Sequence, residues 1–310
     1  MQRIILDTDP GIDDALALFL ALASPEVTLE ALTTVQGNVS VEQTTHNALT
    51  LLTLARRTDI PVARGCADPL VRARVDAAHV HGYNGLGNAT LPEPTLAPVE
   101  QHAVDLIIEK VMQNPGEITL IPIGPLTNIA LAVRREPRIA QHVREVVIMG
   151  GAIRVPGNVT PSSEFNIFAD PHAAHIVFHA GWPLRLVSLD VTTRVSMQRQ
   201  QVEALAAHGS KVTTALQQMM IYYFDVFGPM YGSTTFQMHD PLCLAAAFQP
   251  DLITWESAYV DVELASTLTF GETVGYFNRP DAPTPNMQVS VGVDSERFLN
   301  MFIERITATF

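Results

Sequence analysis

Four aspartates lie within eight residues near the start of the chain, at Asp7, Asp9, Asp13 and Asp14. Like charges this close together repel one another, so the cluster requires a cation that neutralises it. Carboxylate oxygens are the ligands that a hard divalent cation such as Ca²⁺ prefers. The capping of a helix needs one acidic residue and not four. The cluster therefore indicates a metal site more strongly than a helix cap.

The residues around the cluster predict its position in a fold. Residues 4–6 form an apolar run typical of a short buried strand, Pro10-Gly11 predicts a tight turn, and residues 15–22 are typical of an apolar helix. The acids would then lie at the carboxyl end of a strand and in the first turn of the next helix. Ligands bind at that edge of open α/β sheets.

The same alternation continues along the chain. Further strands are expected near residues 29–35, 118–123, 143–149 and 184–189, and helices near residues 41–57, 102–113, 126–135 and 170–180. After about residue 195 the pattern is helical, and shorter strands return near residues 258–264 and 273–276. The fold class is therefore predicted as α/β, a single open, mostly parallel twisted sheet flanked by helices, with a peripheral helical C-terminal part.

No low-complexity linker and no repeat divides the chain, so residues 1–310 are predicted to form a single domain. Residues 76–98 are rich in Gly, Pro and Asn and are expected to form a long loop that acts as a lid.

Polar residues recur where the predicted strands end. Asn38 follows the second strand, and the loop beyond Gly150-Gly151 carries Asn158, Glu164, Phe165 and Asn166. His239 and Asp240 open an apolar helix, with Asp240 at the position of an N-cap. Taken singly, each of these residues has a structural explanation as a cap or a turn residue. Taken together, they are expected to converge on the aspartate cluster.

Composition narrows the classes of function. A hydrophobic content of 47% predicts a large buried core, and a net charge of −13 argues against binding to nucleic acid. Two distant cysteines, the absence of a signal peptide and the absence of a long apolar run predict a cytoplasmic protein that does not enter a membrane.

Three alternative interpretations of the aspartate cluster fit the sequence less well. An EF-hand fails because Gly11 and Leu18 stand where it needs oxygen ligands. A phosphotransferase of the haloacid-dehalogenase type would use Asp7 as its nucleophile, but the following Pro10-Gly11 and the acidic charge suit it poorly. A non-catalytic protein that binds ribose or nucleosides stays open, although binding alone requires neither Asp9 as a base nor His239.

The run from Asp7 to Ala15, DTDPGIDDA, resembles the signature of the nucleoside hydrolases, the inosine–uridine-preferring N-ribohydrolase family. Other segments follow in that family's order and approximate spacing: Gly37-Asn38, Gly124-Pro125-Leu126-Thr127-Asn128, Met149-Gly150-Gly151, Glu164-Phe165-Asn166 and His239-Asp240-Pro241. The resemblance implies an enzyme that depends on Ca²⁺ and hydrolyses the N-glycosidic bond of ribonucleosides, with a role in purine or pyrimidine salvage. It also implies a homo-oligomer, a tetramer.

The resemblance implies roles for particular residues. The cation would be bound by Asp9, Asp14, Asp240 and the backbone carbonyl of Ile123, and Asp9 would also act as the general base. The substrate would be held by Asp13, Asn38, Asn158, Glu164, Phe165 and Asn166. Asp7 is left as support for the cluster. A nucleotide is expected to be rejected, because its phosphate would meet an acidic pocket.

The residues around the nucleobase are less constrained by the sequence. His239 and His81 are both candidates to assist the leaving base, with an exposed loop position as the alternative for His81. Tyr223, Phe227 and Tyr231 are spaced to share one helix face, which suits either core packing or a stacking wall for the base. The preference between purines and pyrimidines stays open, with pyrimidines slightly favoured.

A second group of residues resembles a metal site without belonging to the cluster. His172, His175 and His179 share one face of a predicted helix. Because no carboxylate stands at a fitting spacing, the sequence favours a packing or surface face over a zinc site.

Overall fold

The structure is a computed structural model that describes the backbone of residues 1–310 and every side chain except those of Phe227 and Tyr231. An open sheet of nine strands has the order β10-β9-β11-β6-β5-β4-β1-β2-β3. Neighbouring strands from β3 to β11 are parallel, and β9 is antiparallel to both of its neighbours. The predicted open, mostly parallel sheet is confirmed. The strands are β1 (Gln2–Thr8), β2 (Val27–Thr34), β3 (Val62–Arg64), β4 (Ile118–Pro122), β5 (Glu145–Met149), β6 (Leu184–Val187), β9 (Ile253–Val262), β10 (Thr273–Tyr276) and β11 (Met287–Val293).

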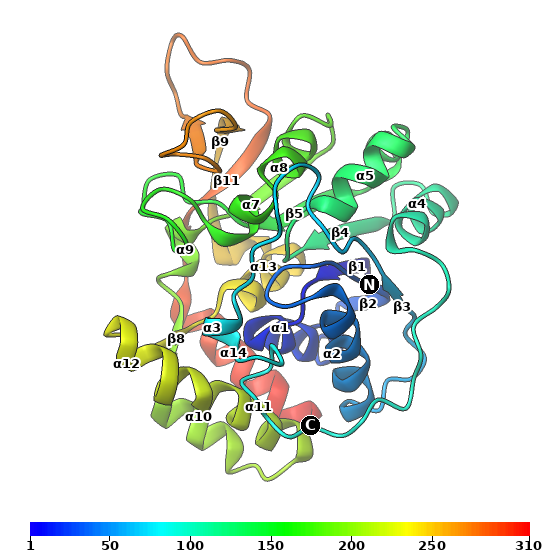
Figure 1. The fold of residues 1–310 in the computed structure, drawn as a ribbon, viewed down its shortest axis with the longest axis vertical. Helices are drawn as coiled ribbons and strands as arrows, with labels where there is room; N and C mark the ends of the chain where they lie inside the picture. The colour runs from blue at the N-terminus through cyan, green and yellow to red at the C-terminus, as the bar shows by residue number, and fades with distance from the viewer.

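Helices cover both faces of this sheet (Figure 1). Alternate residues of β1 point to opposite faces, so Ile4 and Leu6 belong to one hydrophobic cluster and Ile5 to another. The first cluster includes α1 (Ile12–Leu22), α2 (Val41–Leu54), α10 (Arg199–Ala206), α11 (Lys211–Tyr222), α13 (His239–Phe248) and α14 (Ser295–Thr309). The second includes α4 (Ala103–Gln113), α5 (Thr127–Arg135), α6 (Ile139–His142) and α8 (Pro171–Phe178).

The direction of the chain reverses beside β1. From β1 the chain adds β2 and β3 on one side, and then returns to place β4, β5 and β6 on the other. In register, Asp7 of β1 is level with Thr33 of β2 and with Pro122 of β4. The loops that follow these three strands therefore meet at one edge, at a topological switch point where α/β proteins bind ligands.

The last part of the chain differs from the prediction of a peripheral helical part. The strand β11 is inserted between β6 and β9, and so belongs to the central sheet. Helix α14 buries Phe298, Phe302 and Ile306 in the first hydrophobic cluster. The spacing of these three residues is that of one helix face, which is why α14 packs against the core instead of standing apart from it.

Short elements complete the fold. They are α3 (Ala78–His81), α7 (Phe165–Ala169), α9 (Leu189–Thr192), the π-helix η1 (Tyr223–Phe227), α12 (Gly228–Tyr231), the 3₁₀-helix η2 (Pro250–Leu252), and the small antiparallel sheet of β7 (Ser196–Gln198) and β8 (Thr235–Gln237). The expected loop over residues 76–98 contains α3, which contacts η1. Figure 1 shows α10, α11 and α12 at one end of the molecule and α8 with β9 toward the other. Across the described residues, no helix combines the length and apolar character needed to cross a membrane.

Candidate active site

A cavity of about 410 Å³ opens where the loops after β1, β4 and β5 meet. That volume is in the range of small-molecule sites. Eleven of the residues singled out in the sequence line it: Asp13, Asn38, His81, Ile123, Asn158, Glu164, Phe165, Asn166, Tyr223, His239 and Asp240. The other lining residues were given no site role from the sequence, and they are Ala77, His79, Val80, Met149, Val159, Phe236 and Gln237. Most of these residues are apolar or lie in short elements, so their types do not mark them as binding residues.

Three buried carboxyl groups lie together at the floor of the site. Asp13, Asp14 and Asp240 each offer an oxygen within 4.8 Å of the others. The helix α1 begins at Ile12, which places Asp13 and Asp14 in its first turn. The N-cap of α13 is Met238, so Asp240 lies inside the helix and the prediction of an Asp240 N-cap is wrong. Without a capping bond, the Asp240 carboxyl group is available to a ligand.

Asp14 is held in place by several donors. Its Oδ1 accepts a hydrogen bond from Thr8 Oγ1 at 2.5 Å, and its Oδ2 accepts one from the backbone N–H of Gly11 at 2.9 Å. Asn38 Nδ2 donates to Asp14 Oδ2 and to the backbone carbonyl of Asp9, each at 3.1 Å. Asn38 therefore links the loop after β2 to the aspartate cluster.

One oxygen of the Asp9 carboxyl group accepts a hydrogen bond from the backbone, and the other accepts none. Its Oδ2 accepts a hydrogen bond from the backbone N–H of Asn38 at 2.7 Å. Its Oδ1 is buried and has no hydrogen-bond partner among the described residues. A Cβ at Gly37 or at Gly124 would overlap the carboxylate oxygens, so both positions require glycine. An unpartnered buried oxygen of this kind points to a missing ligand.

The electrostatics of the cluster fit a hard cation. Burial, followed by repulsion from Asp14, raises the pKa of Asp13 to about 7, and burial followed by the same repulsion raises the pKa of Asp9 well above its usual range. Burial likewise raises the pKa of Asp14, and burial with repulsion from Asp13 raises the pKa of Asp240. Oxygens on one Ca²⁺ stand at about 2.3–2.6 Å from it, so two of them lie up to about 5 Å apart. The carboxylate oxygens of Asp13, Asp14 and Asp240, which lie within 4.8 Å of one another, meet that limit.

The structure groups Asp13, instead of Asp9, with Asp14 and Asp240. The division of labour in which Asp9 binds the cation and Asp13 binds the sugar stays a prediction. Ile123 lines the cavity, and its backbone carbonyl accepts a hydrogen bond from Asn166 Nδ2 at 2.9 Å. A carbonyl oxygen has a second lone pair, which leaves Ile123 able to act as a ligand.

Asp7 lies behind the site and does not line the cavity. Its Oδ1 accepts hydrogen bonds from Thr33 Oγ1 at 2.5 Å and from Asn128 Nδ2 at 2.8 Å, and its side chain is fully buried. Burial raises the pKa of Asp7 to about 7. Its Oδ2 has no hydrogen-bond partner among the described residues, and Asp9 and Asp14 do not line the cavity either. The two donors on Oδ1 let Asp7 support the end of β1.

Four of the residues expected to hold the substrate come from one loop and α7, whereas Asp13 lies in α1 and Asn38 in the loop after β2. Glu164 caps α7, with Oε1 accepting from the backbone N–H of Asn166 and Oε2 from those of Gly151 and Ile167. Asn158 Oδ1 accepts from the backbone N–H of Phe165 at 3.0 Å. All of these side chains line the cavity, but Glu164 and Asn158 also hold the loop together. Glu164 therefore serves as the N-cap of α7 whatever it binds.

Two histidines face the cavity from different elements. His81 Nδ1 accepts a hydrogen bond from the backbone N–H of Ile12 at 3.1 Å, and His239 Nδ1 is 2.7 Å from Thr192 Oγ1. Burial, with the nearby charges of His239 and His79, lowers the pKa of His81 to about 3, and burial lowers the pKa of His239 to about 4. Both imidazoles are therefore neutral near pH 7.

One residue of the predicted aromatic stripe, Tyr223, can be placed. It begins the π-helix η1, which interrupts the helix before His239. Tyr223 lines the cavity and packs edge-on against Phe236, with ring centroids 5.0 Å apart. The side chains of Phe227 and Tyr231 lie outside the described residues, so their predicted part in base binding stays a prediction.

Comparison with known proteins gives a consistent result. The family described as inosine-uridine preferring nucleoside hydrolase matches residues 4–300. An inosine-uridine preferring nucleoside hydrolase of Leishmania major is 42% identical over 98% of this chain and 97% of its own length. A pyrimidine-specific ribonucleoside hydrolase of an Enterobacter species is 40% identical over 98% and 97%.

A solved structure extends the comparison to the fold. The purine-preferring ribonucleoside hydrolase from Gardnerella vaginalis superposes with a TM-score of 0.94 at 34% identity, covering 99% of each chain. The similarity therefore spans the sheet, the cavity and the C-terminal strands together. The chain belongs to the inosine-uridine preferring nucleoside hydrolase family, and it is an N-glycosyl hydrolase of ribonucleosides.

Proposed function

We propose that this hydrolase depends on Ca²⁺ held by the aspartate cluster. The observation that supports this proposal is the group of three buried carboxyls within 4.8 Å of one another, beside the unpartnered Oδ1 of Asp9. Asp14, Asp240, the carbonyl of Ile123 and Asp9 or Asp13 would hold the ion. When bound, Ca²⁺ would neutralise the buried carboxylates and make a neighbouring water more acidic.

Asp9 is the residue best placed to act as the base. Its Oδ1 has a free lone pair for the proton of an attacking water, while its Oδ2 is fixed by the backbone of Asn38. The water oxygen forms a bond to C1′ of the ribose as the C1′–N bond of the nucleoside breaks, and its proton passes to Asp9. The transition state resembles an oxocarbenium ion, and carboxylates around the sugar stabilise its positive charge.

The two histidines would assist the leaving base by hydrogen bonding. A neutral imidazole carries one N–H, and in His81 that proton is on Nε2 because Nδ1 accepts from Ile12. His239 is fixed by Thr192 on the other wall of the cavity. Because the pKa values of both rings are low, each ring would donate a hydrogen bond to the departing base, and the nitrogen released from C1′ would take up its proton from solvent.

We also propose that the enzyme slightly prefers pyrimidine nucleosides to purine nucleosides. The Leishmania relative, 42% identical, has uridine in its name, and the Enterobacter relative, 40% identical, is named as pyrimidine-specific. The structural neighbour that is named as purine-preferring is 34% identical. Tyr223 and Phe236 offer an apolar wall against which a planar base can stack.

The test is a panel of inosine, uridine and cytidine with wild type and Asp9→Asn, with and without a calcium chelator. Loss of a general base typically lowers the rate by about 10²–10⁴-fold. The expected result is release of free base by wild type, a loss of that order in Asp9→Asn, and loss on chelation that Ca²⁺ restores.

Asp68→Asn is the matched control, because Asp68 is an exposed aspartate outside the cavity. It should behave as wild type. Unchanged activity after complete chelation would remove the calcium proposal, and full activity in Asp9→Asn would remove the assignment of the base. Faster cleavage of inosine than of uridine and cytidine would contradict the pyrimidine preference.

A further inference from the structure

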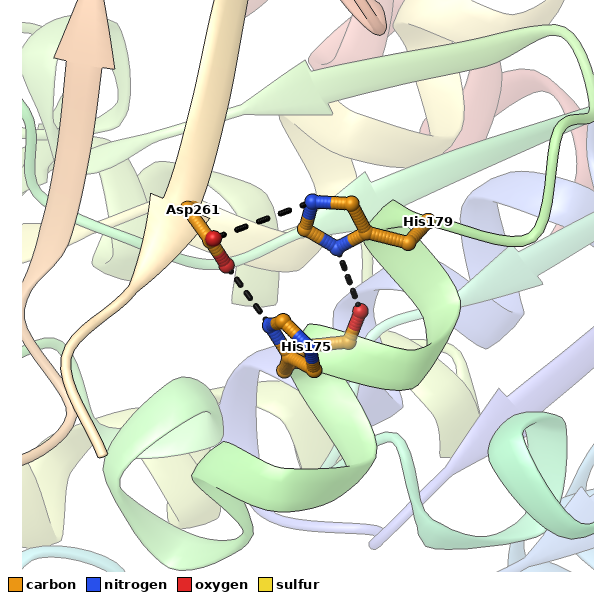
Figure 2. Close-up of side chains that lie close together, drawn as sticks. All are labelled: His175, His179 and Asp261. Atoms are coloured by element: carbon orange, nitrogen blue, oxygen red, sulfur yellow. Dashed lines mark hydrogen bonds and ion pairs between the residues drawn. The ribbon is translucent and has the colours of Figure 1, made fainter. Parts of the chain in front are cut away.

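The second histidine group has a carboxylate partner that the sequence did not indicate. Asp261, on β9, brings its carboxylate to His175 and His179 of α8 and its C-cap (Figure 2). One ligand atom from each of the three residues lies within 4.8 Å of the others. The reason for setting aside a zinc site, the absence of a carboxylate, is therefore wrong. His172 is not part of this group and instead lies with its ring 6.0 Å from that of Phe270.

The spacing of the three groups suits a small metal ion. His175 Nδ1 is 2.7 Å from Asp261 Oδ1, and His179 Nε2 is 3.7 Å from Asp261 Oδ2. Tetrahedral ligands at about 2.0–2.2 Å from zinc stand about 3.3 Å apart, between these two distances. The two histidines are four residues apart on one helix, the separation at which side chains lie side by side. Their ring centroids are 4.5 Å apart.

The surrounding hydrogen bonds orient the ligand atoms. His179 Nδ1 lies 2.8 Å from the backbone carbonyl of His175, an acceptor only, so the proton of the neutral ring is on Nδ1. That tautomer leaves a lone pair on His179 Nε2, which faces Asp261 (Figure 2) and lies 3.2 Å from the Tyr259 hydroxyl, a partner that a metal ion would replace. Histidine ligands of metals commonly donate their other ring N–H to a backbone carbonyl in this way. Asp261 Oδ1 also accepts from the backbone N–H of Val262 at 2.8 Å, which holds the carboxylate in place.

We propose that His175, His179 and Asp261 form a binding site for Zn²⁺ or a chemically similar divalent transition metal. Two imidazoles and one carboxylate give three protein ligands, and a fourth position stays open to water. The three side chains are 32% to 40% exposed, which gives a metal ion access from solvent. The bound ion would join α8 to β9. None of these residues lines the catalytic cavity, so the site is separate from the hydrolytic one.

The site is tested by zinc titration calorimetry in buffer with excess Ca²⁺, using wild type, His179→Ala and Asp261→Asn. Loss of even an outer-shell partner weakens metal binding by about 10–100-fold, so loss of a direct ligand should weaken it by at least about 100-fold. His142→Ala is the matched control, because His142 Nδ1 pairs with the carbonyl of Arg138 four residues earlier, as His179 does with that of His175. It should bind zinc as wild type does.

Cobalt(II) provides a second measurement, because its visible absorption is far stronger in a four-coordinate site with nitrogen ligands than in a six-coordinate oxygen site. Wild type and His142→Ala should show the strong band, and His179→Ala and Asp261→Asn should lose it. Equal zinc affinity in all four proteins would overturn the proposal, as would the absence of zinc binding to wild type. Circular dichroism of each variant establishes that it is folded before its affinity is compared.

Discussion

At the scale of single residues, the site is defined by which oxygens and nitrogens are already occupied. Asp14 and Glu164 each accept hydrogen bonds on both carboxylate oxygens, whereas Asp7 and Asp9 each have one oxygen that accepts none from the described residues. The proximity of Asp7 to Asp14 in the sequence does not separate these roles. Thr33 and Asn128, which donate hydrogen bonds to the Asp7 carboxyl group, are 26 and 121 residues away from it in the sequence. Only the tertiary structure shows which donors hold Asp7, and the assignment of Asp9 as the base stays a proposal.

His81 gives a prediction at the same scale. Its folded pKa of about 3 lies below the unfolded value of about 6.5, so the neutral ring stabilises the fold fully above pH 6.5. That stability is lost as the pH falls toward 3, because protonation of Nδ1 breaks the bond from Ile12. In His81→Asn the amide oxygen keeps an acceptor for Ile12 but does not titrate.

The pH dependence of unfolding in urea measures this effect. Between pH 6.5 and pH 5, wild type should lose up to about 2 kcal/mol more stability than His81→Asn, from one proton over that interval. Acid release of any bound cation affects both proteins alike and cancels in the difference. Parallel stability curves for the two proteins would show that His81 does not titrate with a lowered pKa.

At the scale of elements, the prediction succeeded where a strand is apolar and ends in glycine or proline. The strand near residues 118–123 and the turn at Gly124-Pro125 are examples. The strand β11 was not predicted, because polar residues interrupt its apolar pattern. One of them, Ser290, is buried, and its Oγ accepts a hydrogen bond from the backbone N–H of Ser188 at 3.0 Å. No local pattern contains that contact. The same limit applies to Asp261, which lies 82 residues beyond His179 and becomes its neighbour only in the fold.

Helix α14 gives the prediction for this scale. If the C-terminal helix belongs to the core, then Phe302→Ala, at a position with no exposed surface, should lower the free energy of unfolding by about 3–5 kcal/mol. Asn300→Ala on the exposed face of the same helix should change it by less than about 0.5 kcal/mol. Denaturant midpoints of the three proteins make the comparison. Equal midpoints for Phe302→Ala and Asn300→Ala would mean that α14 is peripheral after all.

At the scale of the whole molecule, the net charge of −13 and the acidic lining of the cavity would both repel an anionic substrate. The cavity presents Asp13, Glu164 and Asp240, and none of its described lining residues is a lysine or arginine. A neutral nucleoside enters such a site without repulsion, and a transition state with positive charge on the sugar is favoured there. A phosphate group has no cationic side chain to pair with in the described lining, so we expect phosphorylated substrates to be disfavoured.

The resulting prediction concerns the best nucleoside substrate and its 5′-monophosphate. Like charges placed together cost several kcal/mol, so kcat/KM for the monophosphate should be lower by at least about 100-fold. The 5′-O-acetyl nucleoside, which is neutral and adds comparable bulk, separates charge from size and should be hydrolysed better than the monophosphate. Screening shortens the range of the repulsion from about 10 Å at 0.1 M salt to about 3 Å at 1 M. If charge causes the rejection, added salt should therefore reduce the difference in kcat/KM between the nucleoside and its monophosphate. If salt leaves the difference in kcat/KM unchanged, and the acetyl ester is hydrolysed as poorly as the monophosphate, then the shape of the cavity and not its charge causes the rejection.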